Sequence, residues 1–239
     1  MSPEAPDIVT SSLAYARRFA GRAGRLFLER QEEVIADALA DKQGVTILDV
    51  GGGHAQLSGP LSAWGHKITV GGSSAACAER LTSDLRNTHV TFCIVTLDRL
   101  PFEARSFDTV ISIRLMAHVE DWQHFLAELC RVARNSVVID YPDLASVNAF
   151  TFATFALKRW TEGDTRRYRN FTASMLKREF ALLGFEVRSV ERQFVLPMAL
   201  HRLLKAPRLL AHAERMAVRV GLTRWFGNPG VMRADRVAR

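Results

Sequence analysis

Three consecutive glycines follow a short apolar segment in "TILDVGGGHA", Thr46 to Ala55. Glycine lacks a Cβ and tolerates positive φ, so such a turn lets a ligand contact the backbone. A helix that begins after the turn also directs unpaired N–H groups toward the ligand. Gly51, Gly52 and Gly53 therefore predict a ligand site, and the alternative is a tight turn that binds nothing.

The spacing of these glycines argues against a dinucleotide. The dinucleotide-binding fingerprint is G-x-G-x-x-G, and counting from Gly51 its last position falls on Gln56. The pattern fails at that position, which leaves other nucleoside-containing ligands as the better interpretation.

The segment "ILDVGGGHA" resembles the first motif of class I S-adenosylmethionine-dependent methyltransferases. In that motif a strand ends in an acid, and alternating glycines follow after one residue. Asp49, Gly51 and Gly53 match, while Ala55 replaces the usual third glycine.

Later segments resemble the same family in the same order: "LPFEARSFDTVIS", "AHVEDWQHFLAELCRVAR" and "LLGFEVRSVE". The Pro-Gly-Gly that usually follows the second of these is absent. The resemblance covers roughly residues 44–194 and is closest to the small-molecule branch that includes ubiquinone and menaquinone methyltransferases.

The resemblance implies S-adenosylmethionine as cofactor, but two expected acids are missing. The family's ribose-binding acid ends the second strand, where this chain has Gly72, with Ser73 as a partial replacement. The acid that meets the adenine amino group falls on Thr96, and Asp98 could stand in for it. Losing a charge-assisted hydrogen bond costs about 1.5–3 kcal/mol, or one to two decades of affinity. The implied cofactor-binding residues are Asp49, Gly51, Gly52, Gly53, Gly72, Ser73, Thr96, Leu97, Asp98 and Arg114.

Methyl transfer from a sulfonium is an in-line displacement, so the enzyme mainly aligns the reactants and removes a proton from a hydroxyl acceptor. His118 lies just after the fourth predicted strand and is the candidate base, because an imidazole titrates near neutral pH. The alternative is that His118 caps or packs the next helix.

Acceptor-binding residues are expected in two places. Tyr15 and Arg18 lie in the leading helices, which fold over the pocket in the family. Arg166 and Tyr168 lie in "GDTRRYRNF", between the fifth strand and the next helix. A solvated loop with one packed tyrosine is the alternative for the second group.

The elements around these residues alternate between strands and helices. Apolar strand candidates such as "VTILDV", "KITV" and "FDTVISI" are each followed by a helical or loop segment. This alternation predicts an α/β fold, a doubly wound, Rossmann-like and mostly parallel seven-stranded sheet. Residues 11–40 predict two leading helices separated near Gly21 and Gly24.

The expected organisation is one structural domain in three parts. Residues 1–43 form an N-terminal helical cap, residues 44–194 the Rossmann-like core, and residues 195–239 a basic helical insertion followed by a final short strand. In the insertion, one predicted helix face carries Leu209, Leu210, Ala213, Met216, Ala217 and Val220, and the other carries Arg208, His212, Arg215 and Arg219. We expect the apolar face to pack on the sheet, and the alternative is peripheral contact with an anionic membrane.

Composition limits the remaining possibilities. The 239 residues are 48% hydrophobic and carry a net charge of +7, and no run of 18 apolar residues occurs. The excess positive charge lies after residue 200, where no nucleic-acid-binding motif stands. Three unclustered cysteines and the absence of a signal-peptide pattern favour a cytoplasmic protein without a metal site.

Two functions remain open at this point. The first is methyl transfer from S-adenosylmethionine to a small molecule, with a hydrophobic acceptor as an open possibility. The second is a non-catalytic or altered-chemistry protein with the same fold and weakened cofactor binding, which Gly72 and Thr96 favour. The oligomeric state does not follow from the sequence.

Overall fold

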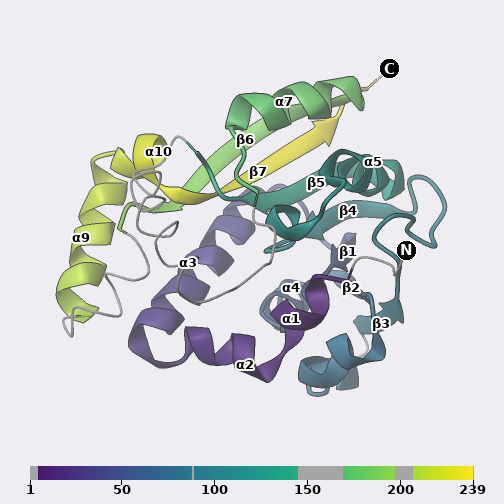
Figure 1. Ribbon diagram of the computed structural model, residues 1–239, viewed down its shortest axis with the longest axis horizontal. Helices are drawn as coiled ribbons and strands as arrows, with labels where there is room; N and C mark the ends of the chain where they lie inside the picture. Colours follow the sequence, from purple (N-terminus) through teal and green to yellow (C-terminus); the bar gives the residue numbers. More distant parts are fainter. Residues whose placement is uncertain (1–4, 88, 145–168, 197–206, 239) are drawn as a thin grey trace.

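The computed structural model describes residues 5–87, 89–144, 169–196 and 207–238, and its seven strands form one sheet (Figure 1). The strand order is β3-β2-β1-β4-β5-β7-β6. The first five strands pair in parallel, and β7 is antiparallel to both of its neighbours. The mostly parallel seven-stranded sheet predicted from the sequence is thereby confirmed. The strands are β1 Thr46–Val50, β2 Lys67–Gly72, β3 Val90–Ile94, β4 Phe107–Ser112, β5 Ala133–Tyr141, β6 Phe185–Phe194 and β7 Asn228–Arg236.

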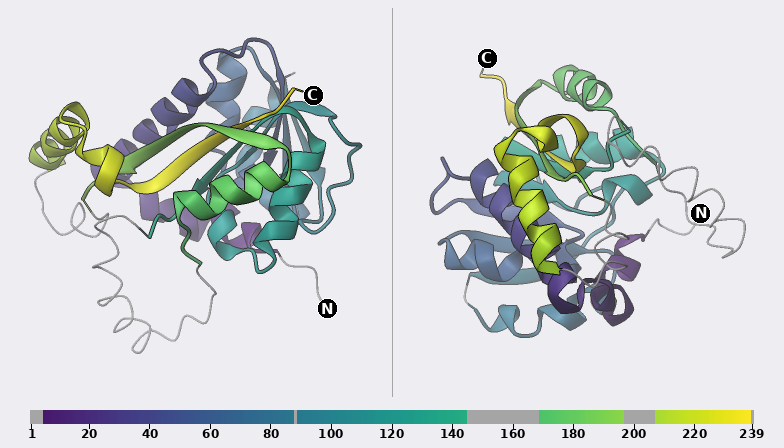
Figure 2. Two further views of the ribbon diagram at one scale, coloured as in Figure 1. Left: turned by 90° about the horizontal axis from the view of Figure 1, so that it is seen from above. Right: turned by 90° about the vertical axis from the view of Figure 1, so that its left-hand side faces the viewer.

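Helices cover both faces of the sheet, as the two further views show (Figure 2). The α-helices are α1 Asp7–Ser11, α2 Leu13–Ala16, α3 Gly21–Ala38, α4 Ser58–Ala63, α5 Trp122–Val132, α7 Ala173–Leu182, α9 Pro207–Arg219 and α10 Leu222–Phe226. Short 3-10 helices are η1 Arg17–Phe19, η2 Gly52–His54, η3 Ala75–Leu81, η4 Asp84–Arg86 and η5 Met116–His118. Among these described helices, none has the length and apolar character needed to cross a membrane.

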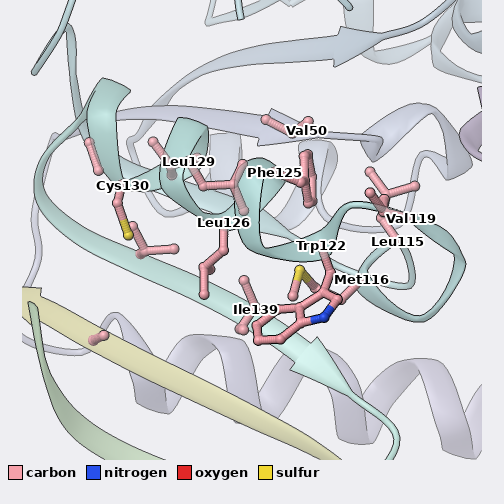
Figure 3. Packing of buried hydrophobic residues seen from close by; sticks show 14 of the residues in the cluster. Val50, Leu115, Met116, Val119, Trp122, Phe125, Leu126, Leu129, Cys130 and Ile139 are labelled. Carbon is pink, nitrogen blue, oxygen red and sulfur yellow. The ribbon is translucent and has the colours of Figure 1, made fainter. Parts of the chain in front are cut away.

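The hydrophobic core has two parts, one on each face of the sheet. The larger part joins α5 and α7 to the sheet, and the smaller joins α3 and α4 to the opposite face. In the larger part, Trp122, Phe125 and Leu129 of α5 point toward the sheet with other buried side chains (Figure 3). Asp121 caps α5 by accepting a hydrogen bond from the His124 N–H. Helix α5 therefore starts directly after the loop that follows β4 and contains His118.

The leading helices divide at one glycine rather than two. Gly21 has φ +79° and separates η1 from α3, as predicted. Gly24 lies inside α3, so its predicted role in the break is wrong. A Cβ on Gly24 would overlap the Phe19 carbonyl, which shows that Gly24 allows η1 to pack closely against α3.

Three further expectations need correction or lie outside the described residues. The segment "AACAERLTSDL" after "KITV" predicts a helix, but residues 75–81 and 84–86 form 3-10 turns. β7 is nine residues long, where a short final strand is predicted. β7 is long because it pairs with both β5 and β6 along its length. The helical region expected after β5 lies in 145–168, outside the described residues.

The expected packing of α9 is wrong. Leu210 is buried, but Met216 is 41% exposed and Val220 is 64% exposed. The buried residue at the centre of the inward face is Glu214, whose carboxylate accepts hydrogen bonds from the Val195 and Leu196 N–H groups at 3.1 and 2.8 Å. The helix is therefore attached through Leu210 and a carboxylate, while most of the predicted apolar stripe stays accessible.

Candidate cofactor and acceptor site

The glycine turn lies at the carboxyl end of β1, in the middle of the sheet. Gly51 has φ +81°, which favours glycine, and its N–H donates to the Gly71 carbonyl of β2 at 2.7 Å. A Cβ on Gly51 would come within 2.8 Å of Leu115. The turn then continues into η2, and Ala55 at its end has φ +55°. In doubly wound sheets this edge of the central strands is where ligands bind.

The other two glycines, Gly52 and Gly53, let the turn pack closely against the Asp49 carboxylate and against segments α1 and η3. A Cβ on Gly52 would overlap the Asp49 carboxylate. A Cβ on Gly53 would overlap the Ser11 hydroxyl of α1 and the Cys77 carbonyl of η3. All three glycines are buried, so the turn holds its shape only without side chains.

Asp49 is an unusual carboxyl group. It is fully buried, and neither carboxyl oxygen has a hydrogen-bond partner within the described parts of the chain. Burial raises its pKa from 3.8 to about 7. A buried carboxyl without partners is costly, so its retention beneath a backbone turn points to a ligand-binding role.

Arg114 organises the neighbouring end of β4. Its backbone adopts φ +65°, and its N–H donates to Asp140 Oδ1 at 2.6 Å. Its Nη2 donates to Gln31 of α3 at 2.8 Å, and its guanidinium lies 4.1 Å from the centroid of the Phe19 ring. Its side chain also interacts with the Tyr15 hydroxyl, and Nη1 has no hydrogen-bond partner among the described residues.

Two titratable groups beside Arg114 have shifted pKa values. Burial raises the pKa of Asp140 to about 6, although its contacts with Arg114 act in the opposite direction. Burial lowers the pKa of His54 to about 3, and the positive charges of Arg114 and Arg80 lower it further. Near neutral pH the ring of His54 is therefore uncharged, and the guanidinium groups supply the positive charge of this region.

The end of β2 receives a carboxylate from another element. Gly72 is buried, and Ser73 donates through its N–H to Asp7 Oδ2 at 2.7 Å and through its hydroxyl to Asp7 Oδ1 at 2.5 Å. Asp7 belongs to α1 and is 0% exposed. The sequence position that lacks an acid therefore lies beside an acid from the N-terminal region.

The loop after β3 holds the other three predicted cofactor residues. Leu97 is buried, whereas Thr96 and Asp98 are exposed. The Thr96 hydroxyl donates to the Arg99 carbonyl at 2.7 Å, which fixes the loop internally. The Asp98 carbonyl lies 2.6 Å from His124 Nε2, so helix α5 also contacts this loop.

The predicted acceptor residues are only partly described. His118 is half-buried at the end of η5, and its N–H donates to the Leu115 carbonyl at 2.9 Å. Tyr15 is brought to Arg114, but the side chain of Arg18 and both Arg166 and Tyr168 lie outside the described residues. The Arg169 N–H donates to the Ala117 carbonyl at 2.9 Å, so the chain after residue 168 returns beside η5.

Sequence reasoning missed four polar residues around the turn: Asp7, Gln31, His54 and Asp140. His54 lies within the quoted segment "TILDVGGGHA", and Asp140 is the last residue but one of β5, so their positions near strand ends were an available signal. Asp7 and Gln31 come from the leading helices, and no local pattern links them to strand ends 66 and 83 residues away.

Comparison with known proteins agrees with this geometry. Residues 48–139 match the family model described as a methyltransferase domain. The ubiquinone biosynthesis O-methyltransferase of Rhizobium leguminosarum bv. trifolii is 23% identical over 169 residues, 66% of this chain and 65% of the relative. The ubiquinone biosynthesis O-methyltransferase of Paramagnetospirillum magneticum is 38% identical over 88 residues, 35% of this chain and 34% of the relative. The chain thus spans less than two thirds of the length of either relative.

Solved structures share the fold at low sequence identity. Magnesium protoporphyrin IX methyltransferase from Synechocystis PCC 6803, with bound SAH, has a TM-score of 0.66 and 15% identity, and the match covers 92% of each chain. A possible histamine N-methyltransferase from Thermotoga maritima has a TM-score of 0.65 and 17% identity, covering 94% of this chain and 95% of that one. The [4+2]-cyclase SpnF has a TM-score of 0.61 and 16% identity, covering 88% and 81%.

Together these findings confirm the resemblance noted in the sequence. Residues 48–139 match a methyltransferase domain, and the chain shares its Rossmann-like fold with solved methyltransferases, one of which was determined with bound SAM and with bound SAH.

Proposed function

We propose that the protein transfers a methyl group from S-adenosylmethionine to a small molecule. The observation that carries this proposal is the buried glycine turn over the unpartnered Asp49 carboxyl, at the carboxyl end of the central strand. The family match includes this turn and extends to β5.

The residues present fit the cofactor. The turn offers backbone that side chains would block, and Asp49 offers two acceptor oxygens without partners among the described residues. The free Nη1 of Arg114 is suited to the cofactor's carboxylate, because a guanidinium binds carboxylates through directed hydrogen bonds. Leu97 and Ser73, on the loops after β3 and β2, stay in the proposed cofactor set, together with Thr96 and Asp98.

The bound cofactor supplies an electrophilic methyl group on a sulfonium. The protein's part is to orient the acceptor for in-line attack and to take its proton. For a hydroxyl acceptor, the protein would hold the hydroxyl oxygen in line with the methyl group and would provide a base for the hydroxyl proton. We propose His118 as that base, because it follows β4 on the same edge of the sheet as the glycine turn.

We propose a small phenolic or hydroquinone-like acceptor. Two curated relatives are named for O-methylation in ubiquinone biosynthesis. On this chain the leading helices bring the rings of Tyr15 and Phe19, 5.6 Å apart, to Arg114 beside the turn. An aromatic and cationic surface of this kind suits a planar, electron-rich acceptor. Arg18, Arg166 and Tyr168 remain proposed acceptor contacts.

Calorimetry with S-adenosylmethionine and S-adenosylhomocysteine tests the first half of the proposal. Radiolabelled methyl transfer to a panel of catechols and hydroquinones tests the second half. His118→Gln should lower kcat at least about a hundredfold on a hydroxyl acceptor and leave the cofactor Kd unchanged. An unchanged kcat in that variant would exclude His118 as the base.

A non-catalytic role is the second candidate, and the end of β2 favours it. Gly72 brings no carboxylate of its own, and α1 packs directly against the glycine turn. This role predicts weak or absent binding of both cofactor forms and no methyl transfer to any acceptor of the panel. The same calorimetric experiment therefore separates the two candidates.

A further inference from the structure

Helix α1 presents its polar side to the protein. Asp7, Thr10 and Ser11 are buried, while Ile8 and Val9 are 40% and 39% exposed. A short surface helix ordinarily buries its apolar side. The polar side of α1 faces the glycine turn, because the Ser11 hydroxyl occupies the space that a Cβ on Gly53 would need. Such a reversed orientation suits a segment that lines a site for a polar ligand.

The carboxylate of Asp7 is held at the end of β2 by three donors. Ser73 contributes its N–H at 2.7 Å and its hydroxyl at 2.5 Å, and the Cys77 thiol lies 3.4 Å from Oδ2. The thiol is a weak donor. A carboxylate has about four acceptor positions, so Asp7 can still accept from two hydroxyl groups, one of them in place of the thiol.

Gly72 itself leaves no room for a carboxylate on β2. A Cβ at this position would lie 2.6 Å from the Cys77 Cβ and 3.0 Å from the Phe92 ring. In doubly wound folds, an acid about twenty residues after the glycine turn binds the ribose hydroxyls of the nucleoside. Here Asp7 places a carboxylate on the residue next to that position, from a segment more than sixty residues earlier.

We propose that Asp7, the first residue of α1, supplies the ribose-binding carboxylate of the cofactor site. The inference rests on the proposed function, since it requires a nucleoside at the glycine turn. It explains why the chain can lack an acid at the end of β2, and why α1 buries an aspartate instead of an apolar residue.

The test compares two ligands by calorimetry: S-adenosylhomocysteine and its 2′,3′-dideoxy analogue, which lacks both ribose hydroxyls. Asp7→Ala should weaken binding of S-adenosylhomocysteine about 10- to 100-fold, because it removes hydrogen bonds to a charged acceptor. The same variant should bind the dideoxy analogue within about twofold of the wild-type value. A merely structural role of Asp7 would weaken both ligands equally and would overturn the inference.

Two further variants keep the test decisive. Asp7→Asn retains the size of the side chain and an acceptor for Ser73, so it serves if Asp7→Ala does not fold. Thr10→Ala is the matched control, because Thr10 is buried in the same helix and its hydroxyl donates to the Asp7 backbone carbonyl at 3.1 Å, not to the Asp7 carboxylate. We expect the control to bind both ligands within about threefold of wild type.

Two other results would overturn the inference. Tighter binding of S-adenosylhomocysteine by Asp7→Ala would show that α1 covers the ribose position and competes with the ligand. If the wild-type protein binds S-adenosylhomocysteine but no Asp7 variant changes its affinity, Asp7 has no part in the site. Absence of binding by the wild-type protein would instead reject the proposed function together with the inference.

Discussion

At the scale of single residues, Asp49 combines complete burial with a carboxyl group that lacks partners among the described residues. Its pKa is raised to about 7, above the value of 3.8 expected when the chain is unfolded. The folded state therefore binds the proton more tightly. The stability that this proton provides is complete below pH 3.8 and is lost as the pH rises toward 7.

Asp49→Asn removes this dependence, because the amide does not ionise. One pKa unit corresponds to about 1.4 kcal/mol, so the variant should gain stability over wild type as the pH increases. We expect its melting temperature to exceed that of the wild type by several degrees more at pH 8 than at pH 5. The other titratable groups are common to both proteins and cancel in the comparison. A difference in melting temperature that stays constant between pH 5 and pH 8 would contradict the raised pKa.

Gly72 illustrates a position whose surroundings cannot be read from the sequence. The family pattern has an acid at this position, but the Cys77 Cβ and the Phe92 ring occupy the space that its side chain would need. Gly72→Ala should lower stability by about 1–3 kcal/mol through overpacking. Gly59→Ala is the control, because the nearest atom to its added Cβ is Asp84 Oδ1 at 3.8 Å. Thermal unfolding measures both, and equal melting temperatures would refute the packing argument.

At the scale of elements, α9 shows how a carboxylate can attach a helix. The Glu214 carboxylate accepts hydrogen bonds from the Val195 and Leu196 N–H groups, which follow β6 directly. In Glu214→Ala, both N–H groups would lose this acceptor. An unpaired donor costs about 1–3 kcal/mol when fully buried and less at the half-buried Val195 and Leu196, so the variant should melt a few degrees lower. Met216→Asp, on the exposed flank, should change stability by less than about 0.5 kcal/mol. A larger loss for Met216→Asp than for Glu214→Ala would show that the apolar flank is packed after all.

The exposed flank of α9 also bears on the membrane question. Met216 and Val220 lie beside the exposed Arg215 and Arg219 on the same helix. Peripheral membrane contact, at most, remains a prediction for this protein, and vesicle sedimentation at low and physiological salt measures it. A membrane interaction would depend on salt, because each basic residue contributes about 1 kcal/mol near an anionic surface.

At the scale of the whole molecule, Arg233 ties the last strand to the first long helix. Its guanidinium contacts Asp41 and donates to the Ala38 carbonyl at 2.8 Å, and it also pairs with Asp235 at 2.8 Å. The hydrogen bond from Arg233 lowers the pKa of Asp41 from 3.8 to about 2. The stability from this pair is therefore present above pH 3.8 and is lost as the pH falls through 2.

Arg233→Gln should destabilise the protein by about 1–3 kcal/mol at pH 7. The estimate lies below the range for fully buried pairs, because the Asp41 side chain is 57% exposed and partly screened. Urea unfolding measures the loss. Arg134→Gln is the matched control, since the Arg134 side chain is 53% exposed where that of Arg233 is 7% exposed, and it should cost less than about 1 kcal/mol. Equal losses would mean that the link between β7 and α3 adds nothing beyond a surface ion pair.

The sequence by itself determined the sheet and the glycine turn, because both depend on local patterns. Alternating apolar segments predict strands such as β1 and β4, and glycines without side chains mark the turn at Gly51. Tertiary structure decided what surrounds that turn. The Asp7 carboxylate reaches Ser73, and Gln31 reaches Arg114, only because the leading helices fold back across the strand ends. Glu214 is likewise buried because its carboxylate accepts hydrogen bonds from the Val195 and Leu196 N–H groups. The spacing of apolar residues along the helix gives no information about these two donors.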